Sequence, residues 1–347
     1  MATHPIETDA LVIGAGPVGL WQVFQLGLQD IRCHVVDALP HAGGQPAELY
    51  PDKPIYDIPG LPVCSGQELI ERLQQQIVPF APQVHAGHTI ETVHRQPDGR
   101  LLVASRQGLA WLTRTLFIAA GVGAFTPRPL NLEGLGTFEG RQLHYRRPAD
   151  TVLTGQDVVV HGGEDEALRA ALDIAGTGLA RRVTLVHRRD VFQAEDALVH
   201  AMRERVAAGQ LSLAIGQPVG ITQEQERLAG LTLALPDGAT QTLPVDQLLV
   251  FLGISPRLGP LVQWGLAMER KQLVVSTDAF QTSEPGIYAV GDINTYPGKK
   301  KLILCGFHEA TLAAFAAAAH LWPQDRQMLQ YTTTSPRLHK LLGVSST

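Results

Sequence analysis

The chain contains two segments in which an uninterrupted apolar strand leads into a glycine-rich loop and then a helix. In the first, a strand at 10–14 is followed by AGPVG, a helical run at 20–30 and a second strand, CHVVD, at 33–37. Val, Leu and Ile without alternation are typical of parallel strands covered on both faces. Strand, helix and strand within about 30 residues is the βαβ nucleotide-binding unit.

The second such segment lies near the middle of the chain. It has a strand at 156–162, a helical stretch at 164–178 and a strand at 183–189. Between the two segments, the pattern predicts an amphipathic helix over 65–80 and antiparallel strands within 88–108. A long Ala-rich helix is expected near the C-terminus.

Clusters of Gly and Pro at 121–129 and at 253–260 indicate two domain junctions. We therefore predict an α/β protein with two Rossmann-like, three-layer nucleotide-binding domains, the second inserted into the first. The first domain is expected over 1–122 and 253–347, and the second over 123–252. Two consecutive domains are the alternative, but they would leave the strand-like IYAVGD segment without a sheet to join.

Composition and charge narrow the function classes. With 347 residues, 45% hydrophobic and 18% charged, the chain has room for two ordinary cores. A net charge of −5 does not favour nucleic acid or an anionic membrane as a partner. No apolar run reaches the roughly 20 residues of a spanning helix, and no signal peptide is evident, so we expect a cytoplasmic protein without membrane contact.

Cysteine and histidine spacing gives no sign of a metal or disulfide site. The three cysteines, Cys33, Cys64 and Cys305, are far apart in sequence, and the 13 histidines include no His-Glu-x-x-His pattern. We expect no metal and three isolated thiols.

The first glycine loop predicts a dinucleotide site. Gly14, Gly16 and Gly19 fit G-x-G-x-x-G, with Pro17 among the expected cofactor-binding residues. The first glycine allows the tight turn, the second lets the backbone approach a pyrophosphate, and the third lets helix and strand pack closely. The N–H groups at the helix N-terminus favour phosphate. Asp37 ends the next strand, where a carboxylate can accept hydrogen bonds from ribose hydroxyls.

Four further segments extend the pattern along the chain: HAGGQPAELYPDKPIYDIPG, AAGVGAFTPRP, PGIYAVGDI and YPGKKKLILCGFHEATLAA, in that order. With them, essentially the whole chain resembles the thioredoxin-reductase-like ferredoxin/flavodoxin–NADP⁺ reductases. The resemblance implies that FAD binds at the first glycine loop. It also implies that Gly44 and Gln45 lie against the cofactor, and that Tyr50 stacks on the isoalloxazine ring.

The same resemblance implies further FAD contacts. Asp292 takes a ribitol hydroxyl, and the helix that opens near His308 and Glu309 points its N-terminus at the flavin, which suits the negative charge of reduced flavin. The remaining implied contacts are Asp57, Ala120, Gly121 and Gly291.

A redox cysteine pair is missing. Thioredoxin reductases carry Cys-x-x-Cys shortly before the second glycine loop, where this chain reads QLHYRRPADTVLTGQD. Without a dithiol, thiol–disulfide exchange has no route, so electrons must leave through the flavin itself.

The chain continues beyond the long helix, over about 323–347. In the family it resembles, such an extension reaches the flavin, often across to a partner subunit. Tyr331 and His339 are the candidates to cover the second flavin face, which would make the protein a homodimer. A plain surface tail is the alternative.

The second glycine loop departs from the family. After Gly162 and Gly163, Glu164 stands where a glycine should touch the pyrophosphate, and Glu166 follows. Like charges about 4 Å apart repel by roughly 4 kcal/mol at an effective dielectric near 20. His187, Arg188 and Arg189, by contrast, are where the family binds the NADPH 2′-phosphate.

Two interpretations of that loop remain open: a tolerated variant that still binds NADPH, or a site that has been lost. We expect an NADPH-dependent reductase of ferredoxin or flavodoxin, in which the flavin carries the chemistry and no side chain is catalytic. The alternatives are an oxidase or a ferredoxin-driven flavoenzyme without nicotinamide, and a non-catalytic flavin-binding module. The run at 299–301, three lysines, suits docking of an acidic carrier or a solvated loop equally.

Overall fold

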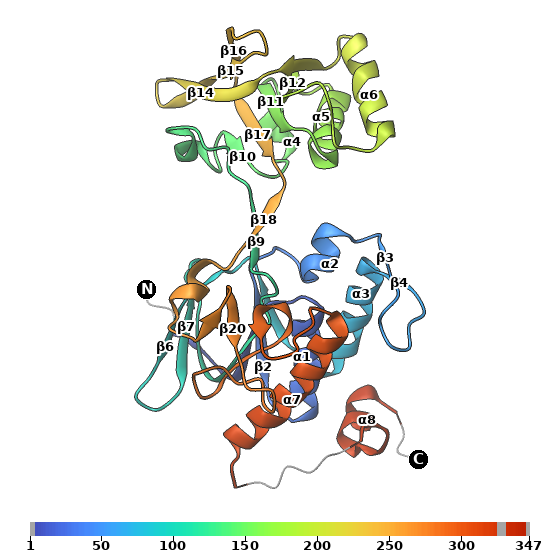
Figure 1. The fold of residues 1–347 in the computed structure, drawn as a ribbon, viewed down its shortest axis with the longest axis vertical. Helices are drawn as coiled ribbons and strands as arrows, with labels where there is room; N and C mark the ends of the chain where they lie inside the picture. The colour runs from blue at the N-terminus through green and yellow to red at the C-terminus, as the bar shows by residue number, and fades with distance from the viewer. Residues whose placement is uncertain (1–3, 325–330, 345–347) are drawn as a thin grey trace. The chain divides into compact units, whose positions relative to one another are not determined.

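The computed structural model describes residues 4–324 and 331–344. It divides into two units, a first unit of Met1–Phe125 with Pro256–Thr347, and a second unit of Thr126–Ser255. These divisions fall three residues after the junctions expected from the sequence, at 122 and 252. The chain passes between the units in β9 (Ala124–Pro127) and β18 (Ile254–Arg257), which pair with each other (Figure 1).

The first unit is built on a seven-stranded sheet with the order β5-β2-β1-β8-β7-β6 and β21 paired to β8. β1, β2, β5, β8 and β21 are parallel, whereas β6, β7 and β8 pair antiparallel. Because β21 lies in the IYAVGD segment, the C-terminal part of the chain completes the N-terminal sheet. The strands are β1 (Ile6–Ile13), β2 (Cys33–Asp37), β5 (Gln83–Ala86), β6 (Ile90–Arg95), β7 (Leu101–Ser105), β8 (Ala110–Ile118) and β21 (Ile287–Ala289).

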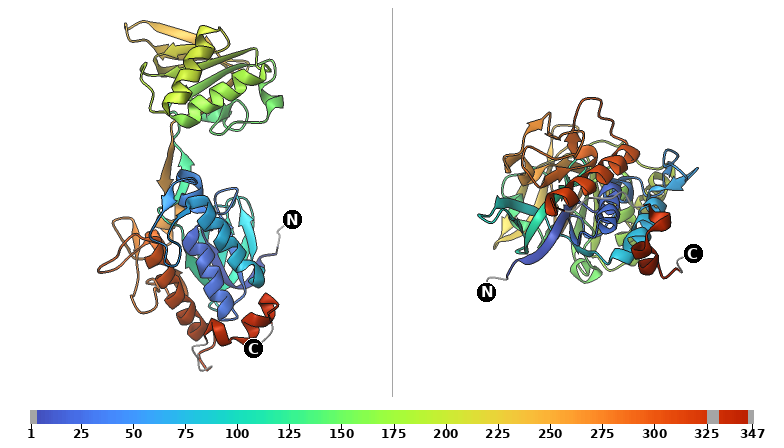
Figure 2. Two further views of the ribbon diagram at one scale, coloured as in Figure 1. Left: turned by 90° about the vertical axis from the view of Figure 1, so that its right-hand side faces the viewer. Right: turned by 90° about the horizontal axis from the view of Figure 1, so that it is seen from below.

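Three helices pack side by side in the first unit (Figure 2). α1 (Pro17–Leu28) contacts both α3 (Gly66–Ile77) and α7 (Ile303–Leu321). A capping box of Ser65 and Glu68 begins α3, because each side chain binds a backbone N–H of the other. The shorter elements are α2 (Gly44–Leu49), β3 (Pro54–Ile55), β4 (Cys64–Ser65), η1 (Val78–Phe80), η3 (Gly259–Gln263), β19 (Met268–Glu269), β20 (Gln272–Val274), η4 (Gly291–Ile293), β22 (Asn294–Thr295), η5 (Thr332–Thr334) and α8 (Pro336–Leu342).

The long helix α7 differs from the sequence expectation in two ways. It begins at Ile303, six residues before the Ala-rich stretch, so its N-terminus lies well ahead of Glu309. By length and composition alone it is apolar enough to cross a membrane, contrary to the expectation that no such run exists. In this fold, one face of the helix is buried against the core, and its small side chains let α1 approach closely: Ala310, Ala313, Ala314, Ala317 and Ala318.

The second unit has three layers around a five-stranded parallel sheet, β10-β17-β11-β12-β13. Val158 and Val160 on β11 pack with α5 and α6, and Val159 between them packs on the opposite side with β15. The predicted α/β class with three-layer, Rossmann-like units is confirmed. Its elements are η2 (Leu135–Phe138), β10 (Leu143–His144), α4 (Asp150–Leu153), β11 (Asp157–Gly162), α5 (Asp165–Thr177), β12 (Arg182–His187), α6 (Asp196–Ala207), β13 (Ser212–Ile215), β14 (Gln217–Glu224), β15 (Arg227–Ala234), β16 (Thr240–Pro244) and β17 (Gln247–Phe251).

Two glycines of the second unit give a matched stability test. A Cβ on Gly162 would lie 2.3 Å from the Phe251 carbonyl oxygen and 2.6 Å from the Ala167 Cβ, whereas one on Gly176, in α5, would meet nothing within 4 Å. We expect Gly162→Ala to destabilise the second unit by about 1–3 kcal/mol. Gly176→Ala should stabilise it by up to about 1 kcal/mol. Calorimetric unfolding of the purified variants measures both, and an unchanged Gly162→Ala transition would contradict the close approach.

Candidate functional site

Backbone segments pass very close to one another where β1 meets α1. Gly14 has φ +105°, and a Cβ there would lie 2.3 Å from the Ala119 carbonyl oxygen. A Cβ on Gly19 would lie 1.9 Å from the Gly14 carbonyl oxygen. These two glycines are therefore required by the fold itself, the first for its backbone conformation and the second for helix–strand packing.

Gly16 is under no such constraint from protein atoms. It is the N-cap of α1 with extended backbone, φ −74° and ψ −176°. A Cβ there would meet only the Gly44 Cα, at an ordinary 3.7 Å. The missing side chain instead leaves the N-terminus of α1 open toward a pocket that Gly16 and Pro17 line. An open helix N-terminus attracts anions.

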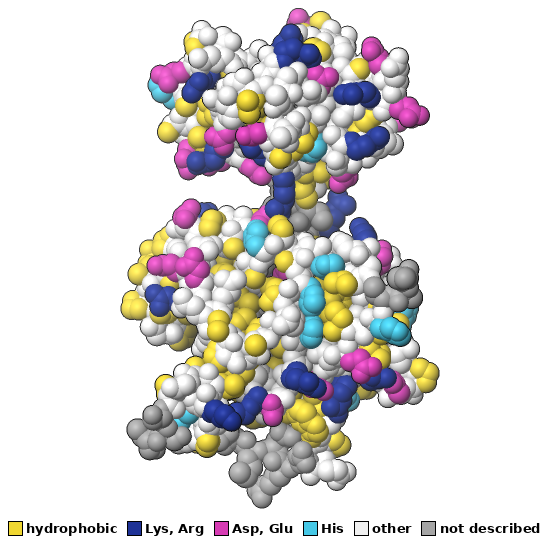
Figure 3. Space-filling model, turned by 180° about the vertical axis from the view of Figure 1, so that it is seen from behind, with side chains coloured by type: hydrophobic (Ala, Val, Ile, Leu, Met, Phe, Trp, Pro, Cys, Tyr) yellow, Lys and Arg dark blue, Asp and Glu magenta, His cyan; other side chains and the backbone are white. Residues whose placement is uncertain are grey.

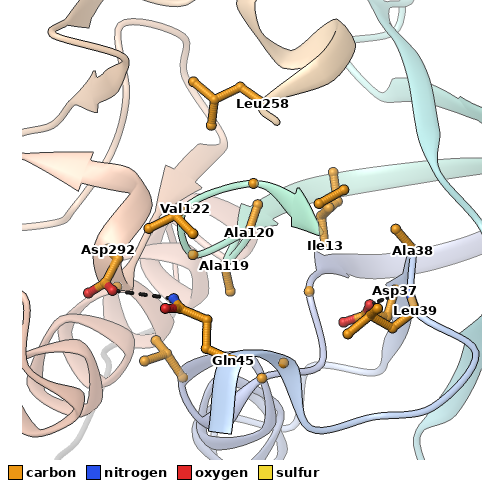
Figure 4. A pocket seen from close by; sticks show the side chains of 18 of the residues that line it. Ile13, Asp37, Ala38, Leu39, Gln45, Ala119, Ala120, Val122, Leu258 and Asp292 are labelled. Carbon is orange, nitrogen blue, oxygen red and sulfur yellow. Dashed lines mark hydrogen bonds between the residues drawn. The ribbon is translucent and has the colours of Figure 1, made fainter. Parts of the chain in front are cut away.

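The pocket lies at the carboxyl ends of β1, β2 and β8, and all its lining residues belong to the first unit. Figure 4 shows Asp37 at one end and Asp292 at the other, with the residues from Ala119 to Val122 between them. An elongated ligand with its phosphates in the middle suits this arrangement. Of the predicted site residues, Gly14, Gly16, Pro17, Asp37, Gly44, Gln45, Tyr50, Ala120, Gly121, Gly291 and Asp292 line it.

Asp37 ties the end of β2 to the glycine loop. Its Oδ2 accepts from the Ala15 N–H at 2.6 Å and its Oδ1 from the Leu39 N–H at 2.8 Å. Burial raises the pKa of this carboxyl group, and the two N–H groups act in the opposite direction. Each oxygen keeps a further lone pair for a ligand hydroxyl.

At the other end, Gln45 and Asp292 join two distant segments. The Gln45 Nε2 donates to the Asp292 Oδ2 at 3.5 Å. Tyr50 is half-buried, and burial, followed by the charges of Asp292 and Asp57, raises its phenol pKa, so the ring stays neutral. Asp57 itself is exposed and outside the pocket wall, because it follows β3 in an outer loop.

The structure corrects the expected position of His308 and Glu309. Both lie in the second turn of α7 or beyond, so Ile303, not either of them, brings the start of this helix to the pocket. His308 is exposed, with its ring 6.4 Å from that of Phe280. Glu309 is fully buried behind the pocket wall and bonds to the Gly291 N–H.

Tyr331 and His339 do not reach the pocket of their own chain. Tyr331 is 67% exposed, and α8, which carries His339, contacts η1. The Arg337 side chain holds α8 by donating to the Gly27 carbonyl oxygen at 2.7 Å. Gly27 is ten residues beyond Pro17 along α1, about 15 Å from the pocket end. The predicted extension over 323–347 is described only in part, since 325–330 and 345–347 lie outside the described residues.

The second glycine loop keeps the architecture of the first. Gly162 approaches the end of β17 as Gly14 approaches the end of β8. Glu164 takes the place of Gly16 as the helix N-cap, with φ −105° and ψ 174°. Because any residue adopts this extended backbone, Glu164 causes no backbone strain. Its side chain is exposed, and so is that of Glu166.

The three residues expected to bind a 2′-phosphate differ in exposure to solvent. Arg188 and Arg189 are exposed just beyond the end of β12. His187 packs inward instead, since a Cβ on Gly163 would lie 2.3 Å from its ring. Burial, then the charge of Arg188, lowers the pKa of His187, so the ring is a poor phosphate ligand at neutral pH. The Gln193 N–H donates to the Gly163 carbonyl oxygen at 2.8 Å.

Several pocket residues have no signature in the sequence. Arg257 and Lys301 are the cations among the lining residues, and they come from segments far apart in the chain. Apolar residues such as Leu258 and Trp264 complete the wall. Only the tertiary fold brings these residues together, although Lys301 belongs to a recognisable run of lysines.

Neither the charges on the face shown in Figure 3 nor the metal-ligand side chains of the described residues indicate a second binding site. Across the face shown in Figure 3, acidic and basic side chains are interspersed. Within residues 4–324 and 331–344, no group of three or more His, Cys, Asp or Glu side chains has the arrangement of a metal site.

Comparisons with known proteins agree with this geometry. A ferredoxin–NADP reductase of Verminephrobacter eiseniae is 56% identical over 345 residues, which cover 98% of each chain. One from Polaromonas naphthalenivorans is 53% identical across 99% of this chain and 94% of its own. A solved thioredoxin reductase from Gloeobacter violaceus shares the fold, with a TM-score of 0.56 at 22% identity, covering 94% of this chain and 98% of its own. The family model described as pyridine nucleotide-disulphide oxidoreductase matches residues 8–317, and the chain belongs to that family.

Proposed function

We propose that the protein is an FAD-dependent oxidoreductase that passes electrons from NADPH to ferredoxin or flavodoxin. The observation that carries this proposal is the pocket of the first unit, which has Asp37 at one end and Asp292 at the other. Gly16 has no side chain to fill the space beside the N-terminus of α1. The relatives that match the chain from end to end support the donor and the acceptor. Bound FAD supplies the means to accept a hydride and to release electrons singly.

The residues of the pocket fit FAD along its whole length. The N–H groups at the start of α1 would hold the pyrophosphate, and Asp37 would accept from the adenosine ribose. Asp292, Gln45 and Tyr50 would hold the other half, with Tyr50 as a neutral ring against the flavin. Lys301, exposed at the pocket, would add a positive charge that favours the anionic reduced form of FAD.

The second unit would bind NADPH through the loop from Gly162 to Glu164 and through the exposed Arg188 and Arg189. The relaxed backbone of Glu164 favours the interpretation of a tolerated variant over that of a lost site. Its carboxylate still repels a phosphate, so we expect weaker NADPH binding than glycine would allow. Solvent screens that repulsion, because the side chain is exposed.

Disulfide reduction is not part of the proposal. The family name includes disulphide chemistry, but the second unit, 126–255, contains no cysteine. Cys33, Cys64 and Cys305 are all free thiols of the first unit. Burial raises the pKa of Cys33 to about 12, which leaves its thiol unreactive.

The acidic carrier would meet fewer lysines than the sequence suggests. Lys299 is buried in an ion pair with Glu309, which leaves Lys300 and Lys301 exposed beside the pocket. We also propose that the protein is a cytoplasmic homodimer. That proposal rests on the family resemblance and on the sequence, and the mass of the purified protein in solution tests the dimer.

Alanine substitutions at Gly14 and Gly16 distinguish a glycine required for folding from a glycine required for FAD binding. Gly16→Ala should leave the apoprotein within about 0.5 kcal/mol of wild-type stability, because its Cβ meets no close protein atom. It should weaken FAD binding at least about tenfold, because the Cβ blocks the approach to the pyrophosphate. Gly14→Ala should instead unfold the first unit readily. Flavin fluorescence titration and thermal unfolding distinguish the two, and unchanged FAD affinity in Gly16→Ala would exclude this pocket.

Turnover with a carrier tests the proposed function directly. The purified, FAD-saturated protein should oxidise NADPH several-fold faster when a bacterial ferredoxin or flavodoxin is added under anaerobic conditions, with the carrier reduced in step. Equal NADPH oxidation with and without carrier, with oxygen as the sole acceptor when air is admitted, would indicate an NADPH oxidase and contradict the carrier assignment. No NADPH oxidation at all would favour the alternatives without nicotinamide: an oxidase of another substrate, a ferredoxin-driven enzyme or a non-catalytic flavin module.

Removing the carboxylate at the second loop should improve the use of NADPH. Glu164→Gly should raise kcat/KM for NADPH about tenfold, because it removes both the Cβ and the like charge. Asp173→Asn removes one exposed charge from the same helix, about two turns further on, and should change kcat/KM little. Equal kcat/KM in wild type and Glu164→Gly would show that this loop does not contact the nucleotide.

A further inference from the structure

Glu309 is a fully buried carboxylate whose hydrogen-bonding capacity is used by four donors. Its Oε2 accepts from the Gly291 N–H at 2.7 Å and from the Asn294 Nδ2 at 2.8 Å. Its Oε1 accepts from the Tyr296 hydroxyl at 2.9 Å and from the Lys299 Nζ at 2.5 Å. Four donors, one of them the Lys299 ammonium group, therefore bind this carboxylate at 0% exposure.

The same network binds both backbone polar groups of Gly291. The Gly291 N–H donates to Glu309, and the Gly291 carbonyl oxygen accepts from the Lys299 Nζ at 2.9 Å. Gly291 has φ +79° and lies in the pocket wall directly before Asp292. The Asn294 side chain also donates to the Ala289 carbonyl oxygen, which joins the end of β21 to this turn. The turn that presents Asp292 is therefore fixed from behind.

Lys299 and Glu309 form a buried ion pair with no net charge. The side chain of Lys299 is 7% exposed and that of Glu309 is 0% exposed, so water screens neither charge. With both present, the net charge behind the Gly291–Asp292 turn is zero. Removing either partner leaves a single unscreened charge next to the pocket, and the sign depends on which partner is removed.

We propose that Glu309 and Lys299 are positioning residues for the flavin: they fix the Gly291–Asp292 turn against the cofactor and set its reduction potential by cancelling each other's charge. The proposal deepens the assignment of FAD to this pocket and rests on it. It does not depend on ferredoxin or NADPH, because the readouts are FAD affinity and potential.

Single and double substitutions test the two parts separately. In FAD-saturated protein, Lys299→Met should lower the midpoint potential, because an unpaired carboxylate disfavours the negative charge of reduced FAD. Glu309→Gln should raise it, because an unpaired ammonium has the opposite effect. We expect about a tenfold change in the preference for reduced over oxidised FAD in each, equivalent to about 30 mV for a two-electron couple. The double variant should return toward the wild-type potential.

FAD affinity reports on the positioning. Both single variants and the double variant should bind FAD at least about tenfold more weakly, whereas Lys299→Arg should stay close to wild type. The control, Asp157→Asn, disrupts the Arg181–Asp157 ion pair of the second unit and should change neither FAD affinity nor potential.

Several results would overturn the proposal. Potential shifts of the same sign in both single variants, or no shift in either, would leave only a structural role for the pair. Unchanged FAD affinity in Lys299→Met would remove the positioning role. If Glu309→Gln fails to fold, the downward shift in Lys299→Met and its restoration in Lys299→Arg still decide the matter. Loss of carrier reduction with all these values intact would count against the proposed function alone.

Discussion

A close approach of two backbone segments in the first unit is the constraint on which its site depends. At the carboxyl ends of β1 and β8, Gly14 lies so near the Ala119 carbonyl oxygen that no side chain fits. Gly19 then lets α1 lie directly on that turn. β1 lies between β2 and β8 in the sheet. The chain continues from β1 to β2 on one side and later adds β8 on the other side, so the strand order reverses at β1. Ligands of open α/β sheets bind at such a point, and the pocket is there.

The same close backbone approach recurs in the second unit, although two positions of the glycine motif differ. Gly162 and the end of β17 repeat the close approach, but the helix N-cap is Glu164 in place of a glycine. The first glycine of the motif, which the close backbone approach requires, is thus kept in both units. The position that only a bound phosphate requires differs, and the third position, Gly19 in the first unit, is Ala167 in the second. This separates residues needed for folding from residues needed for binding, within one motif.

Much of the fold could be predicted from the sequence, because glycine loops and continuous apolar strands leave strong local signals. The ends of β2 at Cys33 and Asp37 coincide with the predicted strand, and α3 begins at its capping box. The start of α7 was missed by six residues, because the lysines and apolar residues before Glu309 show no helical pattern. The packing of α8 beside η1 depends on Arg337 and tertiary contacts, which no local pattern reveals.

The candidate site was predictable where function imposes a local signature, and not elsewhere. The predicted glycines of the first unit, Asp37 and Asp292 were identified from motifs, and all of them except the packing residue Gly19 line the pocket. Glu309 was assigned to the flavin side of its helix, but it is buried behind the pocket wall because α7 starts earlier than expected. Lys299 was grouped with its exposed neighbours, since sequence alone cannot show which lysine of a run finds a buried partner.

An anaerobic titration of the purified, FAD-loaded protein with NADPH tests the central claim most directly, with the visible absorbance of the flavin as the readout. Our account predicts that NADPH bleaches the flavin band, and that NADH does so less effectively because it lacks the 2′-phosphate that Arg188 and Arg189 would bind. A flavin band that NADPH leaves unchanged, while dithionite still bleaches it, would contradict the account and show that the second unit does not deliver electrons from this donor.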